Sequence, residues 1–253
     1  MKVLVTGASS GIGRDLAREF AKRNYDLVLV ARNIERLEEL KQELINEYKV
    51  NAEYISLDLS KRENCIELHS KVKNVDILVN NAGLGDFGEF SETELTKDFS
   101  IIDTNITSVH VLTKLYLKDM REKDSGKILN VASIAGFMPG PLMATYYASK
   151  NYVVRLSEAI KEELHKAKSN VKISILCPGP VRTNFNNVAN VKFELSSLSS
   201  EYVAKYTVDK LLKDKFYIVP GKMIKAGKVL AKIVPTAIVA KVCYRMQKSK
   251  QGK

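Results

Sequence analysis

The feature that most constrains the fold is an alternation of short apolar runs with amphipathic stretches. The apolar runs are uninterrupted and rich in Val, Ile and Leu, which is typical of parallel strands covered by helices on both faces. We therefore predict an α/β fold, a doubly wound parallel sheet of about seven strands. The strands are expected at residues 2–6, 27–30, 53–57, 76–79, 127–131, 171–176 and 216–219.

The predicted helices lie between these strands, at residues 12–23, 34–48, 65–72, 94–120 and 147–166. Parallel sheets of this kind bind ligands outside the carboxyl ends of their strands, so functional residues should follow the strands directly. No internal repeat or low-complexity linker interrupts the chain before residue 220. We expect residues 1–220 to form a single domain and residues 221–253 to form a C-terminal extension.

The first predicted strand runs into a glycine-rich turn, Thr6-Gly7-Ala8-Ser9-Ser10-Gly11-Ile12-Gly13. Glycine permits a tight turn and lets the backbone approach a pyrophosphate closely. The helix that follows offers free N–H groups and the positive end of its dipole to the same anion. An ordinary structural turn is the alternative interpretation of a glycine pattern taken alone.

The second predicted strand is followed by Arg32 and Asn33, with no carboxylate at its end. An acidic residue at this place accepts hydrogen bonds from the adenosine ribose of NAD, and it would repel the 2′-phosphate of NADP. A guanidinium is instead well shaped to pair with that phosphate, and Arg14 is a second candidate. The pattern favours NADP over NAD, with a solvated helix-start residue as the alternative for Arg32.

Tyr146 and Lys150 are four positions apart in a predicted helix, so both side chains can point at one ligand. A tyrosine hydroxyl has a reference pKa near ~10, and a nearby ammonium lowers that pKa because it stabilises the phenolate. Such a pair can exchange a proton with a substrate oxygen, although an exposed surface pair would show the same spacing. Asn105 lies in the interior of a predicted helix, where asparagine is unfavourable, and it therefore indicates a local irregularity.

Several motifs together resemble the short-chain dehydrogenase/reductase family over about residues 1–185: Gly-x-x-x-Gly-x-Gly, the turn Asn80-Asn81-Ala82-Gly83, Ser133 and Tyr-x-x-x-Lys, in the family's order. The resemblance implies that residues 1–220 form a Rossmann-like catalytic domain. It implies a catalytic tetrad of Asn105, Ser133, Tyr146 and Lys150. The implied cofactor-binding residues are Gly7, Ser9, Ser10, Gly11, Ile12, Gly13, Arg32, Asp58, Leu59, Asn81, Ala82, Gly83, Tyr146, Lys150, Pro178, Gly179, Val181 and Thr183.

The same resemblance implies a role for each member of the tetrad. Tyr146 would donate a proton to a carbonyl or accept one from an alcohol, while NADP(H) carries the hydride. Ser133 would orient the substrate oxygen, Lys150 would lower the tyrosine pKa and bind the nicotinamide ribose, and Asn105 would hold a water. The implied protein is an NADP(H)-dependent oxidoreductase, favoured as a reductase of an apolar or mixed ketone, aldehyde or 3-oxoacyl substrate. A dehydrogenase of alcohols or hydroxy amino acids is one alternative, and a non-catalytic NADP(H)-binding regulator is another.

Two apolar segments are candidates for the substrate side. Residues 184–200 correspond to the variable lid of the family, and a second wall is expected from Gly136, Phe137, Met138, Pro139 and Leu142. Packing of the lid against the body would produce the same composition.

The net charge of +11 resides mainly in the C-terminal extension, where residues 221–253 contain nine basic residues and no acidic residue. Apolar residues alternate with these cations, and Pro235 should interrupt any helix. Such a segment could lie on an anionic membrane surface or dock on its own subunit. The nearly neutral remainder and the lack of a reading motif argue against a nucleic-acid partner.

The widely spaced cysteines Cys65, Cys177 and Cys243 and the lack of a recognisable signal peptide predict a cytoplasmic protein, with peripheral membrane contact as an option. The histidines form no metal-ligand spacing with these cysteines, so no metal is expected. Relatives commonly pair through the long helices after the fourth and fifth strands, which implies a homodimer or homotetramer with a small-molecule substrate as the other partner.

Overall fold

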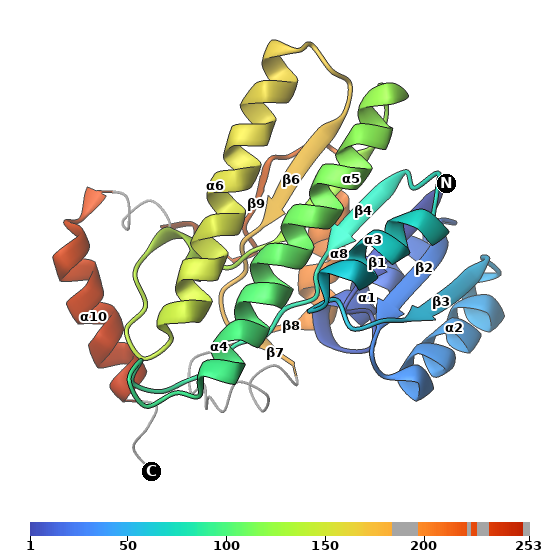
Figure 1. The fold of residues 1–253 in the computed structure, drawn as a ribbon. Coiled ribbons are helices and arrows are strands. Elements are labelled where there is room, and N and C mark those ends of the chain that lie inside the picture. The colour runs from blue at the N-terminus through green and yellow to red at the C-terminus, as the bar shows by residue number, and fades with distance from the viewer. Residues whose placement is uncertain (184–196, 222–223, 227–232, 250–253) are drawn as a thin grey trace.

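The computed structural model describes residues 1–183, 197–221, 224–226 and 233–249. Seven parallel strands form one sheet in the order β3-β2-β1-β4-β5-β6-β9 (Figure 1). The strands are β1 (Lys2–Thr6), β2 (Asp26–Ala31), β3 (Ala52–Ser56), β4 (Ile77–Asn80), β5 (Lys127–Val131), β6 (Lys172–Leu176) and β9 (Tyr217–Ile218). The predicted α/β fold is confirmed.

Helices cover both faces of the sheet (Figure 1). One face packs on α1 (Gly11–Ala21), α2 (Ile34–Tyr48) and α8 (Ser200–Leu211), and the other on α3 (Arg62–Lys71), α5 (Ser108–Glu122) and α6 (Ala144–Lys166). Neighbouring residues of β1 show the alternation, because Val3 and Val5 join the first core cluster while Leu4 joins the second. All β1 side chains from Val3 to Val5 are fully buried, as expected of a parallel strand.

The helix expected at residues 94–120 is not continuous. It consists of α4 (Leu95–Ile102), a π-helical segment η1 (Asp103–Thr107) and α5. The hydrogen bond that leaves η1 joins Ser108 N to Asp103 O, five residues apart, as in a π-helix. Asn105 lies at the centre of this segment, so the irregularity that its residue type predicts is confirmed.

The region after β6 holds elements that the sequence pattern did not predict. A short parallel pair joins β7 (Val181–Arg182) to β8 (Leu198–Ser199), and α8 follows. The lid expected near residues 184–200 stays a prediction, and its last residues form β8 and the first position of α8. Residues 184–196 lie outside the described ranges.

The C-terminal extension contains the helix α10 (Thr236–Lys248), which begins directly after Pro235, as the proline predicts. Cys243 and Gln247 on this helix are buried, so its inner face docks on the subunit. Figure 1 shows α10 beside the start of α6, at a distance from the sheet. None of the described helices has both the length and the apolar character needed to cross a bilayer.

Candidate active site

The turn between β1 and α1 has no room for side chains at its glycines. Gly7 and Gly11 have φ angles of +65° and +54°, which L-residues with a Cβ rarely adopt. A Cβ on Gly13 would lie 2.3 Å from both the Asn81 Nδ2 and the Gly7 O atoms. The spacing Gly-x-x-x-Gly-x-Gly is thus required by the local packing of the turn.

The start of α1 fits an anion such as a pyrophosphate. The N-cap residue Ser10 makes no side-chain capping hydrogen bond, and the first turn contains no acidic residue. The first N–H groups of a helix need partners from outside the helix, and an anion is favoured there by the dipole. The glycine turn and the uncapped helix start therefore form a phosphate-sized cradle at the carboxyl edge of β1.

The turn after β4 is fastened to this cradle by hydrogen bonds. Thr6 Oγ1 accepts from the backbone N atoms of Asn81 (2.9 Å) and Ala82 (3.0 Å), and it donates to Val79 O (3.2 Å). The Asn81 side-chain amide donates to Thr6 O (2.9 Å) and Gly7 O (3.2 Å). Asn81 therefore holds the two turns together through its amide nitrogen.

Arg32 stands exposed at the end of β2, on the same edge of the sheet. Its backbone carbonyl accepts a hydrogen bond from Ser56 Oγ (3.2 Å), and within the described residues its guanidinium makes no ion pair. Arg14, the second candidate cation, lies with its Nε 3.7 Å from Asp15 Oδ1. Arg32 is consequently the cation that remains free to meet an anionic ligand beside β2.

The remaining cofactor candidates border the same edge. Asp58 Oδ1 accepts from Ser60 N (3.1 Å) and Leu59 is buried, so these two residues shape the turn after β3. Thr183 packs against the glycine turn, because a Cβ on Gly11 would lie 3.0 Å from its Cγ2. Pro178 O accepts from Ile134 N (2.9 Å), which ties the segment Pro178–Gly179–Val181 to the loop after β5.

Asn105 braces the site through its side chain. Its Oδ1 accepts from Leu84 N (2.8 Å), and its Nδ2 donates to Leu84 O and to Ser149 Oγ, both at 2.9 Å. Ser149 Oγ in turn donates to Tyr146 O (2.7 Å). Both amide hydrogens are thus donated to protein atoms, and the expected water-holding role stays a prediction. The π-helical geometry of η1 brings the asparagine far enough inward to join the β4 turn to α6.

Ser133 and Tyr146 meet on the loop side of α6. Ser133 Oγ accepts from Ala135 N (3.2 Å) at the start of the 3₁₀ turn η2 (Ile134–Phe137), and the serine is hydrogen-bonded to Tyr146. Low-polarity surroundings raise the pKa of Tyr146 to about 12, and the hydrogen bond with Ser133 opposes this rise. Taken as a whole residue, Tyr146 is half-buried.

Lys150 is 5% exposed, and its Nζ donates to Val131 O (3.0 Å). Burial lowers the pKa of this lysine to about 8. Its Nζ lies 5.8 Å from the centroid of the Tyr146 ring. Desolvation of the phenolate outweighs the hydrogen bond with Ser133 in the pKa of Tyr146, and the lowering of this pKa by Lys150 stays a prediction.

Tyr147 has a separate role from its neighbour. Its ring lies edge-on to that of Tyr146, with centroids 6.0 Å apart, and its hydroxyl accepts from Gln247 Nε2 (2.8 Å) on α10.

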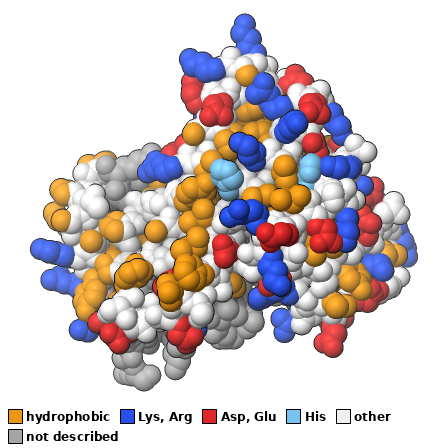
Figure 2. Space-filling model, viewed as in Figure 1, with side chains coloured by type: hydrophobic (Ala, Val, Ile, Leu, Met, Phe, Trp, Pro, Cys, Tyr) orange, Lys and Arg blue, Asp and Glu red, His pale blue; other side chains and the backbone are white. Residues whose placement is uncertain are grey.

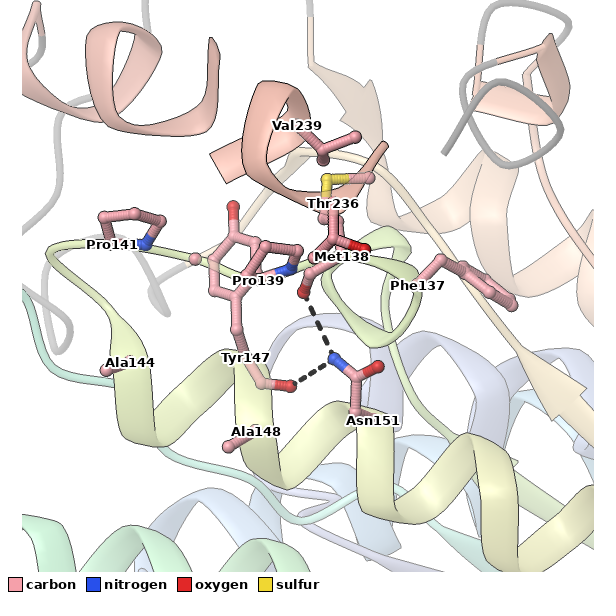
Figure 3. A pocket seen from close by; sticks show the side chains of 11 residues that line it. Phe137, Met138, Pro139, Pro141, Ala144, Tyr147, Ala148, Asn151, Thr236 and Val239 are labelled. Atoms are coloured by element: carbon pink, nitrogen blue, oxygen red, sulfur yellow. Dashed lines mark hydrogen bonds between the residues drawn. The ribbon is translucent and has the colours of Figure 1, made fainter. Parts of the chain in front are cut away.

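Beside Tyr147 lies a cavity of about 620 Å³ (Figure 3). Of the expected substrate wall, Phe137, Met138 and Pro139 line this cavity, whereas Gly136 and Leu142 are packed behind it.

The contact between Gln247 and Tyr147 could not be anticipated, since a hundred residues separate the partners and neither belongs to a motif. The cavity lies beside the α6 face that carries Tyr147, and Tyr146 and Lys150 are absent from its lining. The candidate catalytic residues Tyr146 and Lys150 therefore lie outside this cavity, although Tyr147, the neighbour of Tyr146, lines it. Within the described ranges, no group of His, Cys, Asp or Glu side chains could hold a metal ion.

Known proteins have sequences similar to that of this chain. A sequence profile described as short chain dehydrogenase matches residues 1–192. Very-long-chain 3-oxoacyl-CoA reductase of Anas platyrhynchos is 32% identical over 202 residues, which cover 76% of this chain and 63% of that protein. 17-beta-hydroxysteroid dehydrogenase type 3 of Homo sapiens is 34% identical over 210 residues, which cover 79% and 65%. The matched part is less than two thirds of the length of either relative.

Solved structures agree with the sequence matches. A short-chain dehydrogenase from Sphingobium yanoikuyae in complex with NADPH is 27% identical with a TM-score of 0.83, and the match covers 93% of this chain and 97% of that one. A short-chain dehydrogenase/reductase from Burkholderia phymatum in complex with NAD is 26% identical with a TM-score of 0.83, covering 90% and 92%. These proteins support a nicotinamide nucleotide as the cofactor without selecting between NAD and NADP. The chain belongs to the short-chain dehydrogenase/reductase family.

Proposed function

We propose that this chain is an NADP(H)-dependent oxidoreductase that interconverts a carbonyl and an alcohol, with Tyr146 as the general acid and base. The observation that carries the proposal is that the turn after β4, which is fastened to the glycine turn, lies next to the candidate catalytic residues. A Cβ on Gly83, in the turn fastened to the glycine cradle, would lie 3.4 Å from Lys150 Nζ and 3.3 Å from Asn105 Oδ1. A dinucleotide that follows this edge from the cradle would therefore end beside the tyrosine and the lysine.

Each residue has a defined task in this proposal. The cofactor supplies the hydride. Tyr146 gives its proton to the carbonyl oxygen. Ser133, which is hydrogen-bonded to Tyr146, orients that oxygen. Lys150, with a pKa of about 8, remains mostly protonated at neutral pH and places a positive charge in the buried floor of the site. Asn105 keeps α6 and the β4 turn in register.

The direction favoured is reduction of an apolar or mixed ketone, aldehyde or 3-oxoacyl compound. The name of the Anas platyrhynchos relative supports the 3-oxoacyl class. NADPH consumption with a panel of such carbonyls tests the proposal. Oxidation of alcohols or hydroxy amino acids is the second candidate, and NADPH binding without turnover on any panel member would support the non-catalytic regulator instead.

NADP preference rests on Arg32. Arg32→Asp is expected to lower the ratio of kcat/KM with NADPH to kcat/KM with NADH by about 10- to 100-fold, because a charge-assisted hydrogen bond of ~1.5–3 kcal/mol is lost. Arg121→Asp, at the far end of α5, makes the same charge change and should leave the ratio unaltered. A ratio that does not change in Arg32→Asp would refute the role of this residue.

We also propose a homodimer or homotetramer through the helices after β4 and β5. Leu95 and Phe99 on α4 are 64% and 54% exposed, and Figure 2 shows hydrophobic side chains gathered over α4. An exposed apolar cluster of this kind is typical of an association surface. Sedimentation equilibrium at micromolar concentration is expected to give a dimer or larger species, which Phe99→Glu weakens at least tenfold. A monomeric wild-type chain would contradict the proposal.

The outer face of α10 is the basis for peripheral membrane contact by a chain that is otherwise expected in the cytoplasm. Ile238, Val242 and Met246 are spaced four residues apart and are each about half exposed. Lys241 and Arg245 lie beside this stripe, and Figure 2 shows hydrophobic and basic side chains together on the left, where Figure 1 places α10. The combination is suited to an anionic bilayer surface, although the inner face of the same helix docks on the subunit.

A further inference from the structure

The cavity between α6 and α10 has walls that suit a hydrocarbon chain (Figure 3). Its lining is mainly apolar and comes from three segments: Phe137, Met138, Pro139, Gly140 and Pro141 from the loop after β5, Ala144, Tyr147, Ala148 and Asn151 from α6, and Thr236 and Val239 from α10. Its volume of about 620 Å³ is in the range of small-molecule sites.

The side-chain amide of Asn151, which belongs to this lining, is already hydrogen-bonded to other protein atoms. Asn151 Nδ2 donates to Ala135 O (3.1 Å), Met138 O (3.2 Å) and Tyr147 O (2.9 Å), two of which are drawn in Figure 3. These bonds fix the shape of the wall and leave the amide nitrogen without a further hydrogen to offer. The cavity therefore presents mainly van der Waals surface to an occupant.

A second, smaller cavity of about 350 Å³ adjoins the first at Pro141 and is basic. It is lined by Pro141, Ala240, Lys241, Tyr244 and Arg245. Neither Lys241 nor Arg245 makes an ion pair with any residue that the structure describes, and residues 221–253 include no acidic side chain. The two cavities thus share Pro141 in their linings, and the second one holds two cations that are free to meet an anion.

The roof of the apolar cavity is fixed to its floor by contacts from α10. Cys243 Sγ lies 3.6 Å from Met138 Sδ, and Gln247 Nε2 donates to the Tyr147 hydroxyl at 2.8 Å. Both α10 residues are buried. The cavity is consequently a defined part of the folded chain, formed by the C-terminal helix.

From this juxtaposition we propose that the α6–α10 cavity binds one anionic single-chain amphiphile. Its hydrocarbon chain occupies the apolar cavity, and its carboxylate lies at Lys241 and Arg245. The site is separate from the candidate catalytic residues, because Tyr146 and Lys150 are not part of its lining. The proposal is independent of the oxidoreductase activity, since binding requires neither cofactor nor turnover.

Calorimetric titration of the full chain with laurate, below its micelle concentration, tests the proposal. Val239→Trp fills the apolar cavity and is expected to weaken laurate binding at least tenfold, whereas Ile238→Trp, which points outward at 52% exposure, should bind like the wild type. Thr236→Phe, at the first position of α10, is a second filling variant in case Val239→Trp does not fold. Loss of binding in a filling variant together with normal binding in Ile238→Trp is the supporting result.

The headgroup is tested with a matched pair of charge reversals on the same helix. Arg245→Glu is expected to weaken laurate binding about tenfold and to leave binding of uncharged dodecanol unchanged, while Lys248→Glu, outside both cavities, should alter neither. No binding of laurate by the wild type, or equal losses in Arg245→Glu and Lys248→Glu, would overturn the proposal. Phosphatidylserine vesicles that bind the wild type while laurate does not would assign this helix to a membrane surface instead.

Discussion

Tyr146→Phe should lower kcat for carbonyl reduction by about 10²- to 10⁴-fold, the usual contribution of a positioned general acid. Phenylalanine keeps the ring that packs with Phe87 and Tyr147 around Met143, so the fold and the cofactor cradle should not change. The affinity for NADPH, measured by quenching of its fluorescence or by calorimetry, should stay within about twofold. The substitution removes only the hydroxyl group, with its proton and its hydrogen bond to Ser133.

Tyr147→Phe is the matched control for this substitution. It removes the hydroxyl that accepts from Gln247 and leaves the bond between Ser133 and Tyr146 in place. We expect a small loss of stability, on the order of 1 kcal/mol for one hydrogen bond, and a kcat near that of the wild type. Retained turnover in Tyr146→Phe, or a larger loss of kcat in Tyr147→Phe, would show that the wrong tyrosine has been assigned.

Lys150→Met should abolish most turnover and yet stabilise the fold. Burial lowers the lysine pKa from 10.5 to about 8, so at pH 7 the charged side chain costs free energy on folding although it remains mostly protonated. Methionine removes that penalty at similar volume but loses the hydrogen bond to Val131 O, which offsets part of the gain. The net increase in the free energy of unfolding is expected to be about 2 kcal/mol at pH 7, measured by urea denaturation.

The pH dependence gives this prediction a second readout. Because the folded-state pKa lies below the unfolded one, the unfolded chain binds more protons between pH 8 and pH 10.5. The free energy of unfolding of the wild type should therefore rise with pH across that window relative to Lys150→Met. Lys118→Met, at an exposed position on α5, serves as the control and should follow the wild type. A Lys150→Met variant that is less stable at every pH would contradict the assigned burial penalty.

The sheet and the position of the site could be predicted because they depend on short local patterns in the sequence. Uninterrupted apolar runs such as residues 127–131 mark buried parallel strands, and that strand has the predicted bounds. Gly7 and Gly13 are required by backbone geometry, so their spacing is directly readable. Asn105 indicated a local irregularity because asparagine is unfavourable inside a helix, and this residue lies in the π-helical segment.

Other features depend on contacts between distant residues, which no local pattern encodes. α8 has apolar residues at helical spacing, yet its place beside α1 depends on the ion pair of Arg23 with Asp209 and on packing across the sheet edge. The cavity beside α6 exists only because α10 returns to contact Met138 and Tyr147. The rise in the pKa of Tyr146 also has no local signal, since desolvation depends on the whole surrounding fold.

Hydride transfer itself tests the central claim most directly. The wild-type chain is incubated with NADPH deuterated at C4 of the nicotinamide, in both stereochemical forms, and with the panel of ketones, aldehydes and 3-oxoacyl thioesters. Mass spectrometry then locates the label. We predict deuterium on the carbinol carbon of at least one product with one cofactor stereoisomer, and none in the Tyr146→Phe reaction over the same time. Tight NADPH binding with no label transferred to any carbonyl, and no oxidation of the alcohol panel, would contradict the account.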